Sequence, residues 1–272
     1  MPIASIKTEA SAFGAVLRRH RAARGVSQER LARDAEISTR HLSCLETGRA
    51  APSKTMVLVL GSALDLPLRE RNALLEAAGF VAAYRDLPLE APEAAALRRA
   101  IDLMLDGIEP NGAIACDRTW NLLQMNQAAT RLFAAFVDLA AAPPEVMRNV
   151  LVATLHPLGL RPAIVNFTEV AAMALDRARR EAAAFSDDPE VARIRAAVAA
   201  IPDLPAPETP RGAEGPFITV HLRRNGVEAR LFTTIATIGT PTDATAEDIR
   251  IETYFPADEA TAAWMRALAR PA

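Results

Sequence analysis

The stretch from Gly25 to Ser53 reads GVSQERLARDAEISTRHLSCLETGRAAPS and predicts two short helices joined by a tight turn. Ser27 is a favourable N-cap for the first helix, which is expected to end near Ala35. Ser38 can cap the second helix, and Gly48 supplies its C-terminal stop. Apolar residues recur at helical spacing in each segment, so both helices are expected to pack on a common core.

The second of these helices keeps short polar and cationic side chains on its outer face. Leu42 and Leu45 are the inward positions, which leaves Thr39, Arg40, Ser43 and Cys44 outside. This is the geometry of a helix-turn-helix, whose second helix enters the major groove of DNA. The alternative is a solvated face on an ordinary helical domain. Arg40 is the strongest candidate for base contact, because a guanidinium can bind both O6 and N7 of guanine.

Several motifs in this stretch agree in type and spacing with a known family. Ser27-Gln28-Glu29 with Leu31-Ala32, Ile37-Ser38 and Leu45-Glu46-x-Gly48-x-x-x-Pro52-Ser53 resembles the helix-turn-helix of the XRE/Cro/phage-repressor group. The resemblance implies a phosphate contact for Gln28, base contacts for Thr39, Arg40, Ser43 and Cys44, and DNA-backbone contacts for Arg49 and Lys54. It also implies that Arg21 and Glu46 form a structural pair between the first and third helices.

The basic residues of the chain are concentrated around this stretch. The whole chain carries 31 Lys and Arg against 33 Asp and Glu, a net charge of −2, whereas residues 12–54 hold nine basic and four acidic residues, an excess of five. A local excess of basic residues is typical of surfaces that bind nucleic acid. The chain has 272 residues, half of them apolar, so a second domain is expected beyond a helix-turn-helix unit of roughly 70 residues.

Helix start and stop signals predict an all-α, five-helix, lambda-repressor-like domain in residues 1–80. Its first helix is expected over residues 11–24, after a frayed tail at residues 1–10. Pro52 precedes the fourth helix, and Gly79 stops the fifth. Residues 81–104 are then expected to form a linker, stiffened by its prolines, and a connecting helix.

Residues 105–272 show the pattern of an α+β domain. An Asn225-Gly226 pair between two β-branched runs predicts a hairpin. Five strands are expected in one antiparallel sheet, at residues 113–117, 120–125, 217–222, 229–238 and 249–255. Helices are expected at residues 126–136, 145–155, 163–185, 189–200 and 258–268.

A second resemblance covers nearly the full chain. It is carried by Glu70-Arg71-Asn72-x-Leu74-Leu75-x-Ala77-Ala78-Gly79-Phe80, Asp117-x-x-Trp120-Asn121, Leu155-His156-Pro157-x-Gly159-Leu160-Arg161 and Ile164-Val165-Asn166-Phe167. These motifs resemble the MmyB-like transcription regulators, which couple an XRE helix-turn-helix to a PAS-like ligand-binding domain. The resemblance implies a small hydrophobic, fatty-acid-like ligand and no other cofactor.

Candidate pocket residues follow from this resemblance and not from spacing, and plain core packing is the alternative for each apolar one. They are Trp120, Met125, Phe133, Phe136, His156, Asn166, Phe167, Met173, Phe217 and Phe232. His156 suits a helix end or a cavity mouth, and Asn166 suits a helix cap or the pocket. Any of Arg161, Arg177 and Arg223 could anchor a carboxylate or be a surface charge.

Catalytic and metal-binding patterns are absent from the sequence, which contains no Gly-x-Ser-x-Gly, His-Glu-x-x-His, glycine-rich phosphate loop or paired cysteines at zinc spacing. We therefore expect no enzyme and no metal site. Cys44 and Cys116 are isolated, which suits a reducing cytoplasm better than a disulfide or a redox switch. Neither an export signal nor a membrane span is expected.

Together these patterns predict a cytoplasmic, one-component transcription regulator that binds a palindromic operator as a homodimer and senses a small hydrophobic ligand. Two alternatives stay open for the second domain. It could be a protein-interaction module of antitoxin type with no ligand, marked by an exposed apolar patch. It could also be a cryptic enzyme, marked by convergent titratable groups in a cavity.

Overall fold

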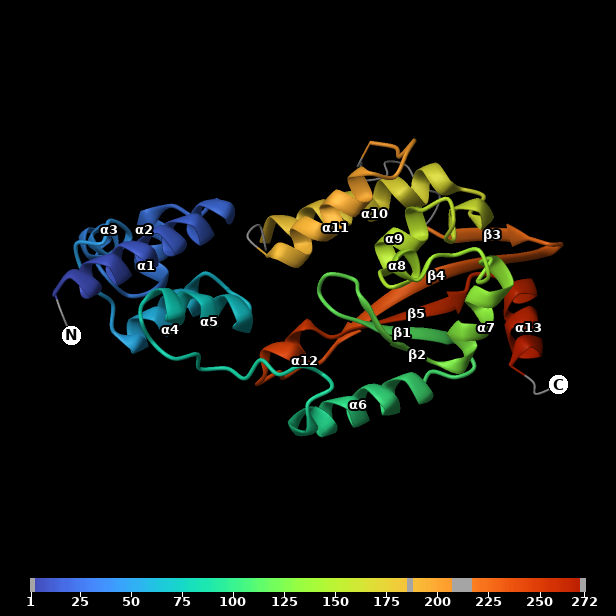
Figure 1. Ribbon diagram of the computed structural model, residues 1–272, viewed down its shortest axis with the longest axis horizontal. Helices are drawn as coiled ribbons and strands as arrows, with labels where there is room; N and C mark the ends of the chain where they lie inside the picture. Colours follow the sequence, from blue (N-terminus) through green and yellow to red (C-terminus); the bar gives the residue numbers. More distant parts are fainter. Residues whose placement is uncertain (1–2, 185–187, 207–216, 270–272) are drawn as a thin grey trace. The chain divides into compact units, whose positions relative to one another are not determined.

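The computed structural model describes residues 3–184, 188–206 and 217–269 and divides into two compact units (Figure 1). The first unit comprises Met1–Ala91 together with Thr240–Glu247. The second comprises Pro92–Gly239 and Asp248–Ala272. The segment at residues 240–247, which connects two strands of the second unit in sequence, therefore belongs to the first unit.

A bundle of five helices makes up most of the first unit, as the sequence predicts. They are α1 (Ile3–Ala23), α2 (Gln28–Asp34), α3 (Thr39–Glu46), α4 (Lys54–Ala63) and α5 (Leu68–Ala77). The side chains of Ser27, Ser38 and Ser53 cap α2, α3 and α4 by accepting a backbone N–H three residues on. Gly79 ends the bundle with a φ of 78°, a left-handed conformation that glycine adopts without strain.

The expected frayed tail at residues 1–10 is wrong for the described residues, because α1 begins at Ile3. The segment contains neither glycine nor a proline after Pro2, and its alanines favour the helix. Gly14, on the same helix, lies so close to α3 that an added Cβ would be 2.5 Å from the carbonyl oxygen of Leu45. Helices α1 and α3 thus meet backbone to backbone at this point.

The 240–247 segment is held to the first unit by hydrogen bonds. Thr245 Oγ1 donates to the carbonyl oxygen of Leu87 at 2.7 Å and accepts the Leu87 N–H at 3.1 Å. The Leu68 N–H, at the start of α5, donates to Glu247 Oε2 at 2.5 Å. The segment includes most of the short helix α12 (Ala244–Asp248). It therefore ties the end of the predicted linker to the last helix of the bundle.

The second unit is built on a five-stranded antiparallel sheet, confirming the predicted α+β fold. Its strands are β1 (Gly112–Cys116), β2 (Leu122–Met125), β3 (Val220–Arg224), β4 (Val227–Thr237) and β5 (Arg250–Pro256), in the order β2-β1-β5-β4-β3. Asn225 and Gly226 both have positive φ and close the β3–β4 hairpin. Strand β5 occupies the centre and pairs with β1 and β4.

Helices of the second unit pack on the sheet and on each other (Figure 1). They are α6 (Ala95–Asp106), α7 (Gln127–Phe136), α8 (Pro144–Met147), α9 (Val150–Leu155), α10 (Phe167–Ala184), α11 (Pro189–Ala199) and α13 (Glu259–Leu268), with short 3-10 turns at Pro92–Ala94 and Arg161–Ala163. Asn149 caps α9, and Asp188, immediately before Pro189, caps α11.

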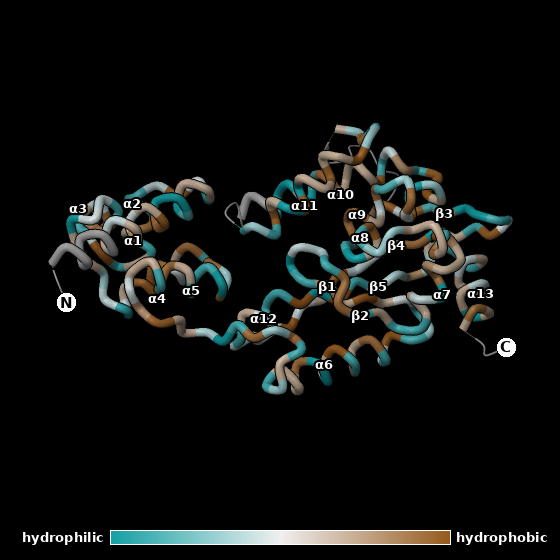
Figure 2. The backbone as a smooth tube through the Cα atoms, in the orientation of Figure 1, coloured by the Kyte–Doolittle hydropathy of each residue, from teal (hydrophilic) through white to brown (hydrophobic). Residues whose placement is uncertain are grey.

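Helix α6 alternates hydrophobic and hydrophilic positions along its length (Figure 2). Its Ile101 and Leu105 are buried, so one face of the helix packs on the unit. Among the described residues, no helix is both long and apolar enough to cross a bilayer.

Candidate functional site

The outer face of α3 carries the residues implied to contact DNA. Thr39 and Arg40 are exposed, and Ser43 and Cys44 are half-buried, while Leu42 on the inner face is fully buried. Within the described residues, the guanidinium of Arg40 has no ion pair or hydrogen bond with protein. An exposed, unpaired guanidinium beside short side chains is suited to reading base edges in the major groove.

The phosphate-contact candidates differ in how they are held. Lys54 and Arg49 are exposed, and Arg49 Nε donates to Thr47 Oγ1 at 2.9 Å. The amide of Gln28 donates to Glu46 Oε2 at 2.7 Å, so the side chain is engaged inside the unit. The role of Gln28 at DNA phosphate stays a prediction of the family resemblance.

Arg21 on α1 and Glu46 on α3 form a bidentate ion pair. Arg21 Nε lies 2.5 Å and Nη2 lies 2.9 Å from the two carboxylate oxygens, and Arg21 Nη1 donates to the carbonyl oxygen of Val26. Burial alone would raise the pKa of Glu46, but hydrogen bonds from Arg21 and Gln28 outweigh it and lower the pKa. The pair joins α1 to α3 and thereby fixes the orientation of α3 relative to α1.

A cavity of about 150 Å³ lies in the second unit between the sheet and its helices. All five strands of the sheet supply one wall, and α7, α9 and α10 supply most of the rest. Most side chains in the wall are apolar; the polar ones are Trp120, Thr154, Arg177, Thr233, Glu252 and Tyr254. An apolar pocket with few polar groups is the usual form of a small-molecule site.

Four of the ten predicted pocket residues line this cavity: Trp120, Met125, Phe133 and Met173. Phe232 does not, because Leu231 and Thr233 face the cavity and side chains alternate along a strand. Phe217 stacks on Phe232, with ring centroids 4.7 Å apart.

Another four predicted residues lie off the cavity wall for separate reasons. Phe136 is buried against Trp264 of α13, and the ring of Phe167 lies beneath the Arg161 guanidinium, 4.5 Å away. His156 follows the end of α9 and accepts the Leu158 N–H. Asn166 bonds to the backbone at Thr219 and His221, so it holds the β3 edge and does not face the cavity.

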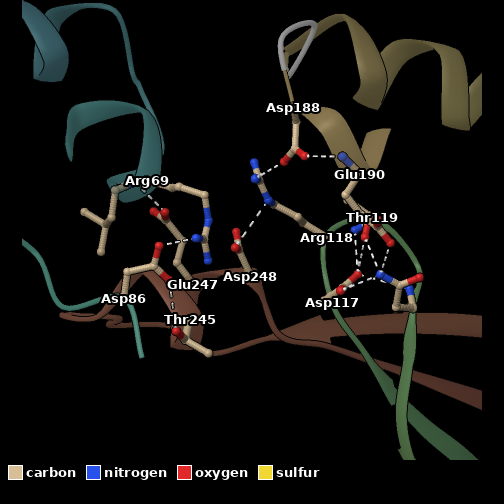
Figure 3. Close-up of polar contacts among 12 residues, drawn as sticks. Arg69, Asp86, Asp117, Arg118, Thr119, Asp188, Glu190, Thr245, Glu247 and Asp248 are labelled. Atoms are coloured by element: carbon tan, nitrogen blue, oxygen red, sulfur yellow. Dashed lines mark hydrogen bonds and ion pairs between the residues drawn. The ribbon is translucent and has the colours of Figure 1, made fainter. Parts of the chain in front are cut away.

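Trp120 is positioned by an unusual turn. It has a positive φ of 67° and follows Asp117, whose Oδ1 accepts hydrogen bonds from Thr119 N–H and hydroxyl and from the Asn121 N–H (Figure 3). In the same turn, Arg118 bonds to Asp188, and its Nε lies 3.4 Å from Asp248 Oδ2. The turn therefore places Trp120 at the cavity and also binds Asp248, two residues before β5 begins.

A carboxylate at the edge of the cavity collects three donors. Glu181 accepts Trp120 Nε1 at 2.8 Å, Arg177 Nε at 3.0 Å and Arg250 Nη1 at 2.9 Å. Burial raises the pKa of Glu181, but the two arginines and Trp120 lower it further than burial raises it. The Arg177 guanidinium also lies over the Trp120 ring, 4.3 Å from its centroid.

The other two candidate carboxylate anchors are engaged elsewhere. Arg161 Nη1 donates to the carbonyl oxygen of Pro202, and Arg223 pairs with Glu228. Both cysteines are free thiols; burial raises the pKa of Cys116 to about 12, so it is protonated and unreactive at neutral pH. This weakens the redox alternative for Cys116.

The sequence reasoning missed the polar groups of β4 and β5 that face the cavity, namely Thr233, Glu252 and Tyr254. A signal existed, because an acid in the interior of a strand, as Glu252 is in β5, is unusual. The register of β5 decides which face is inward, and that register depends on its pairing with both neighbours.

A helix-turn-helix unit followed by an α+β domain with an apolar cavity is the architecture of a two-domain helix-turn-helix regulator. The chain belongs to the family described as MmyB-like transcription regulator ligand binding domain, whose model matches residues 97–268. A helix-turn-helix domain model matches residues 12–74. The family predicted from the sequence motifs is therefore confirmed.

Solved structures that match part of the chain include two bacterial regulators. The clp gene regulator ClgR from C. glutamicum is 32% identical, with 26% of this chain and 88% of that chain covered and a TM-score of 0.24. The restriction-modification controller protein C.AhdI from Aeromonas hydrophila is 35% identical, with 23% and 94% covered and a TM-score of 0.22. No curated protein matches the chain.

Proposed function

We propose that this transcription regulator binds a two-fold symmetric operator as a homodimer and that a small apolar ligand in the second unit modulates the binding. The observation that carries the proposal is the apolar cavity of about 150 Å³ within the family's ligand-binding domain. Most of the wall is apolar, so placing an apolar molecule there removes apolar surface from water and is favourable.

The homodimer is proposed from the geometry of DNA reading. One recognition helix reaches only a few base pairs, and a second copy related by a two-fold axis doubles the contacts. Two α3 helices would then enter successive major grooves about 34 Å apart.

The 240–247 segment supports a route from ligand to DNA. It is hydrogen-bonded to the first unit through Thr245 and Glu247, and the chain then continues into β5, which carries two residues of the cavity wall. Arg118, in the turn that presents Trp120, pairs with Asp248 at this junction (Figure 3). A ligand that shifts β5 or this turn would act on the first unit through the covalent chain, with a coupling of about 1–3 kcal/mol.

Arg40→Ala is expected to weaken binding to the operator by about 1–3 kcal/mol and to leave non-specific binding nearly unchanged, because Arg40 contacts base edges. The operator would be obtained by in vitro selection from random duplexes, and affinities measured by fluorescence anisotropy at fixed salt. Arg266→Ala removes the same charge from an exposed site on α13 and serves as the control. Equal loss on operator and random DNA would contradict base reading.

Filling the cavity is expected to abolish ligand retention. Ala174 lines the cavity from α10, and Ala174→Phe would occupy its space, whereas Ala196→Phe on the exposed face of α11 is the matched control. Mass spectrometry of organic extracts from undialysed protein should find an apolar molecule with the wild type and the control only. Adding that molecule back should change operator affinity about 5–150-fold in the wild type. An identical extract from the Ala174→Phe variant would refute the proposed site.

A further inference from the structure

The cavity wall contains a small polar patch on two neighbouring strands. Thr233 of β4 and Tyr254 of β5 are directly paired across the sheet, and Glu252 lies two residues before Tyr254 on the same face. Tyr254 Oη donates to Glu252 Oε2 at 3.4 Å. Because β5 is the central strand, this patch lies in the middle of the sheet and not at its rim.

Glu252 is the acid of this wall, and it has no ion-pair partner among the residues that the structure describes. Its half-buried side chain lines the cavity. Burial raises the pKa of Glu252, while the charge of Arg177 and hydrogen bonds from Thr233 and Tyr254 oppose the rise. A carboxyl group in an apolar wall with so few donors has unused acceptor capacity.

Arg177, the cationic residue of the wall, already has a carboxylate partner. Arg177 donates to Glu181 at 3.0 Å and stacks on Trp120, so the neighbouring carboxylate offsets much of its charge. A ligand carboxylate would therefore meet an arginine whose charge is largely offset and a glutamate that has no ion-pair partner among the described residues. Two carboxylates in one apolar site disfavour each other's ionised form.

The size of the cavity limits the apolar part of the ligand. An engineered cavity of about 150 Å³ lined by apolar side chains binds benzene, and this cavity has a volume of about 150 Å³. A single aromatic ring or an aliphatic body of similar volume fits within it, whereas a long acyl chain exceeds its volume.

Resting on the proposed function of the cavity as a ligand site, we propose that its ligand is a small apolar molecule with a hydrogen-bond-donating head group, an amine or a hydroxyl. Glu252 is the acceptor that selects this head group against a carboxylate. The proposal departs from the fatty-acid-like ligand that the family resemblance implies.

Benzylamine, benzyl alcohol and benzoate share an aromatic ring and differ in the head group. Comparing them distinguishes the effect of the head group on affinity from the effect of the apolar contacts. Their affinities for the full chain at pH 7 would be measured by ligand-observed NMR titration, with Ala174→Phe reporting binding outside the cavity. Wild type is expected to bind benzylamine and benzyl alcohol at least tenfold more tightly than benzoate. In the Glu252→Gln variant, the affinity for benzylamine should fall at least tenfold, while the affinity for benzoate should not fall. Glu228→Gln, an exposed acid on β4, should leave all three affinities unchanged.

Each outcome decides a different claim. Equal affinities of the three probes in wild type, all lost in Ala174→Phe, would overturn the head-group selection and leave the proposed pocket standing. Binding that Ala174→Phe does not reduce, or no binding at all, would overturn the proposed ligand site and this inference with it. The order of the three affinities in the wild type tests the head-group selection even if the Glu252→Gln variant does not fold.

Discussion

Replacing Glu46 with alanine is expected to lower the free energy of unfolding of the first unit by about 3 kcal/mol, near the lower end for a broken buried ion pair. The variant leaves Arg21 without its bidentate partner, although Arg21 keeps some contact with solvent. It also removes the acceptor of the Gln28 amide. Urea titration followed by helical circular dichroism would measure the loss. The fluorescence of Trp120 and Trp264 identifies the second unit's transition, since both tryptophans lie in that unit.

The pH dependence of this effect has a defined sign. The folded-state pKa of Glu46 is lowered, so its contribution is fully present above the ordinary value of 4.5 and is lost as pH falls through the lowered value. The difference between wild type and Glu46→Ala should therefore narrow in acid. A difference that stays constant down to about pH 2 would argue against the ion pair as its source.

Two variants test the cause of the loss. Glu29→Ala removes an exposed acid from α2 and should change stability by no more than about 0.5 kcal/mol. The double variant Arg21→Met with Glu46→Leu should recover much of the loss, because an apolar pair of similar volume leaves no charge buried alone. A double variant as unstable as Glu46→Ala would show that cavity formation or lost packing dominates.

Local signals explain why the first unit could be predicted from sequence. Ser27, Ser38 and Ser53 each cap the helix that they precede, and Gly79 takes the left-handed conformation that ends the bundle. Such signals act within a few residues, so no knowledge of the remaining chain is needed. The same holds for the Asn225-Gly226 hairpin.

Long-range contacts set the limit of the sequence reasoning. The hydrogen bonds between Thr245 and Leu87 join residues 158 positions apart, and neither residue carries a periodic signal that indicates its partner. The cavity poses the same problem. Phe133 faces it whereas Phe136, one helical turn on, packs on Trp264. Both are apolar residues of one helix, and only the packing of α13 tells them apart.

Replacing Asn126 with alanine is expected to lower the free energy of unfolding of the second unit by about 4 kcal/mol. This is a larger effect than that expected for Glu46→Ala. Asn126 is buried at 5% exposure, and its Oδ1 accepts the N–H groups of Ala129 and Ala113 at 2.8 and 2.9 Å. Its Nδ2 donates to the carbonyl oxygens of Asn111 and Leu105. Alanine would remove the cap of α7, worth about 1 kcal/mol, and would leave the Ala113 and Asn111 groups unpaired at about 1–3 kcal/mol each.

The fluorescence of Trp120 and Trp264 follows this transition in urea, and Gln127→Ala, at the exposed neighbouring position, should shift it by less than about 0.5 kcal/mol. Asn126→Ser is a second comparison, because a serine retains the capping oxygen but cannot donate to two carbonyl groups. It should recover about 1 kcal/mol of the loss and no more. Full recovery would mean that the cap alone stabilises the start of α7 and that the bonds to the β1 segment contribute nothing. A partial recovery supports Asn126 as the residue that fastens α7, which carries Phe133 of the cavity wall, to the strand beneath it.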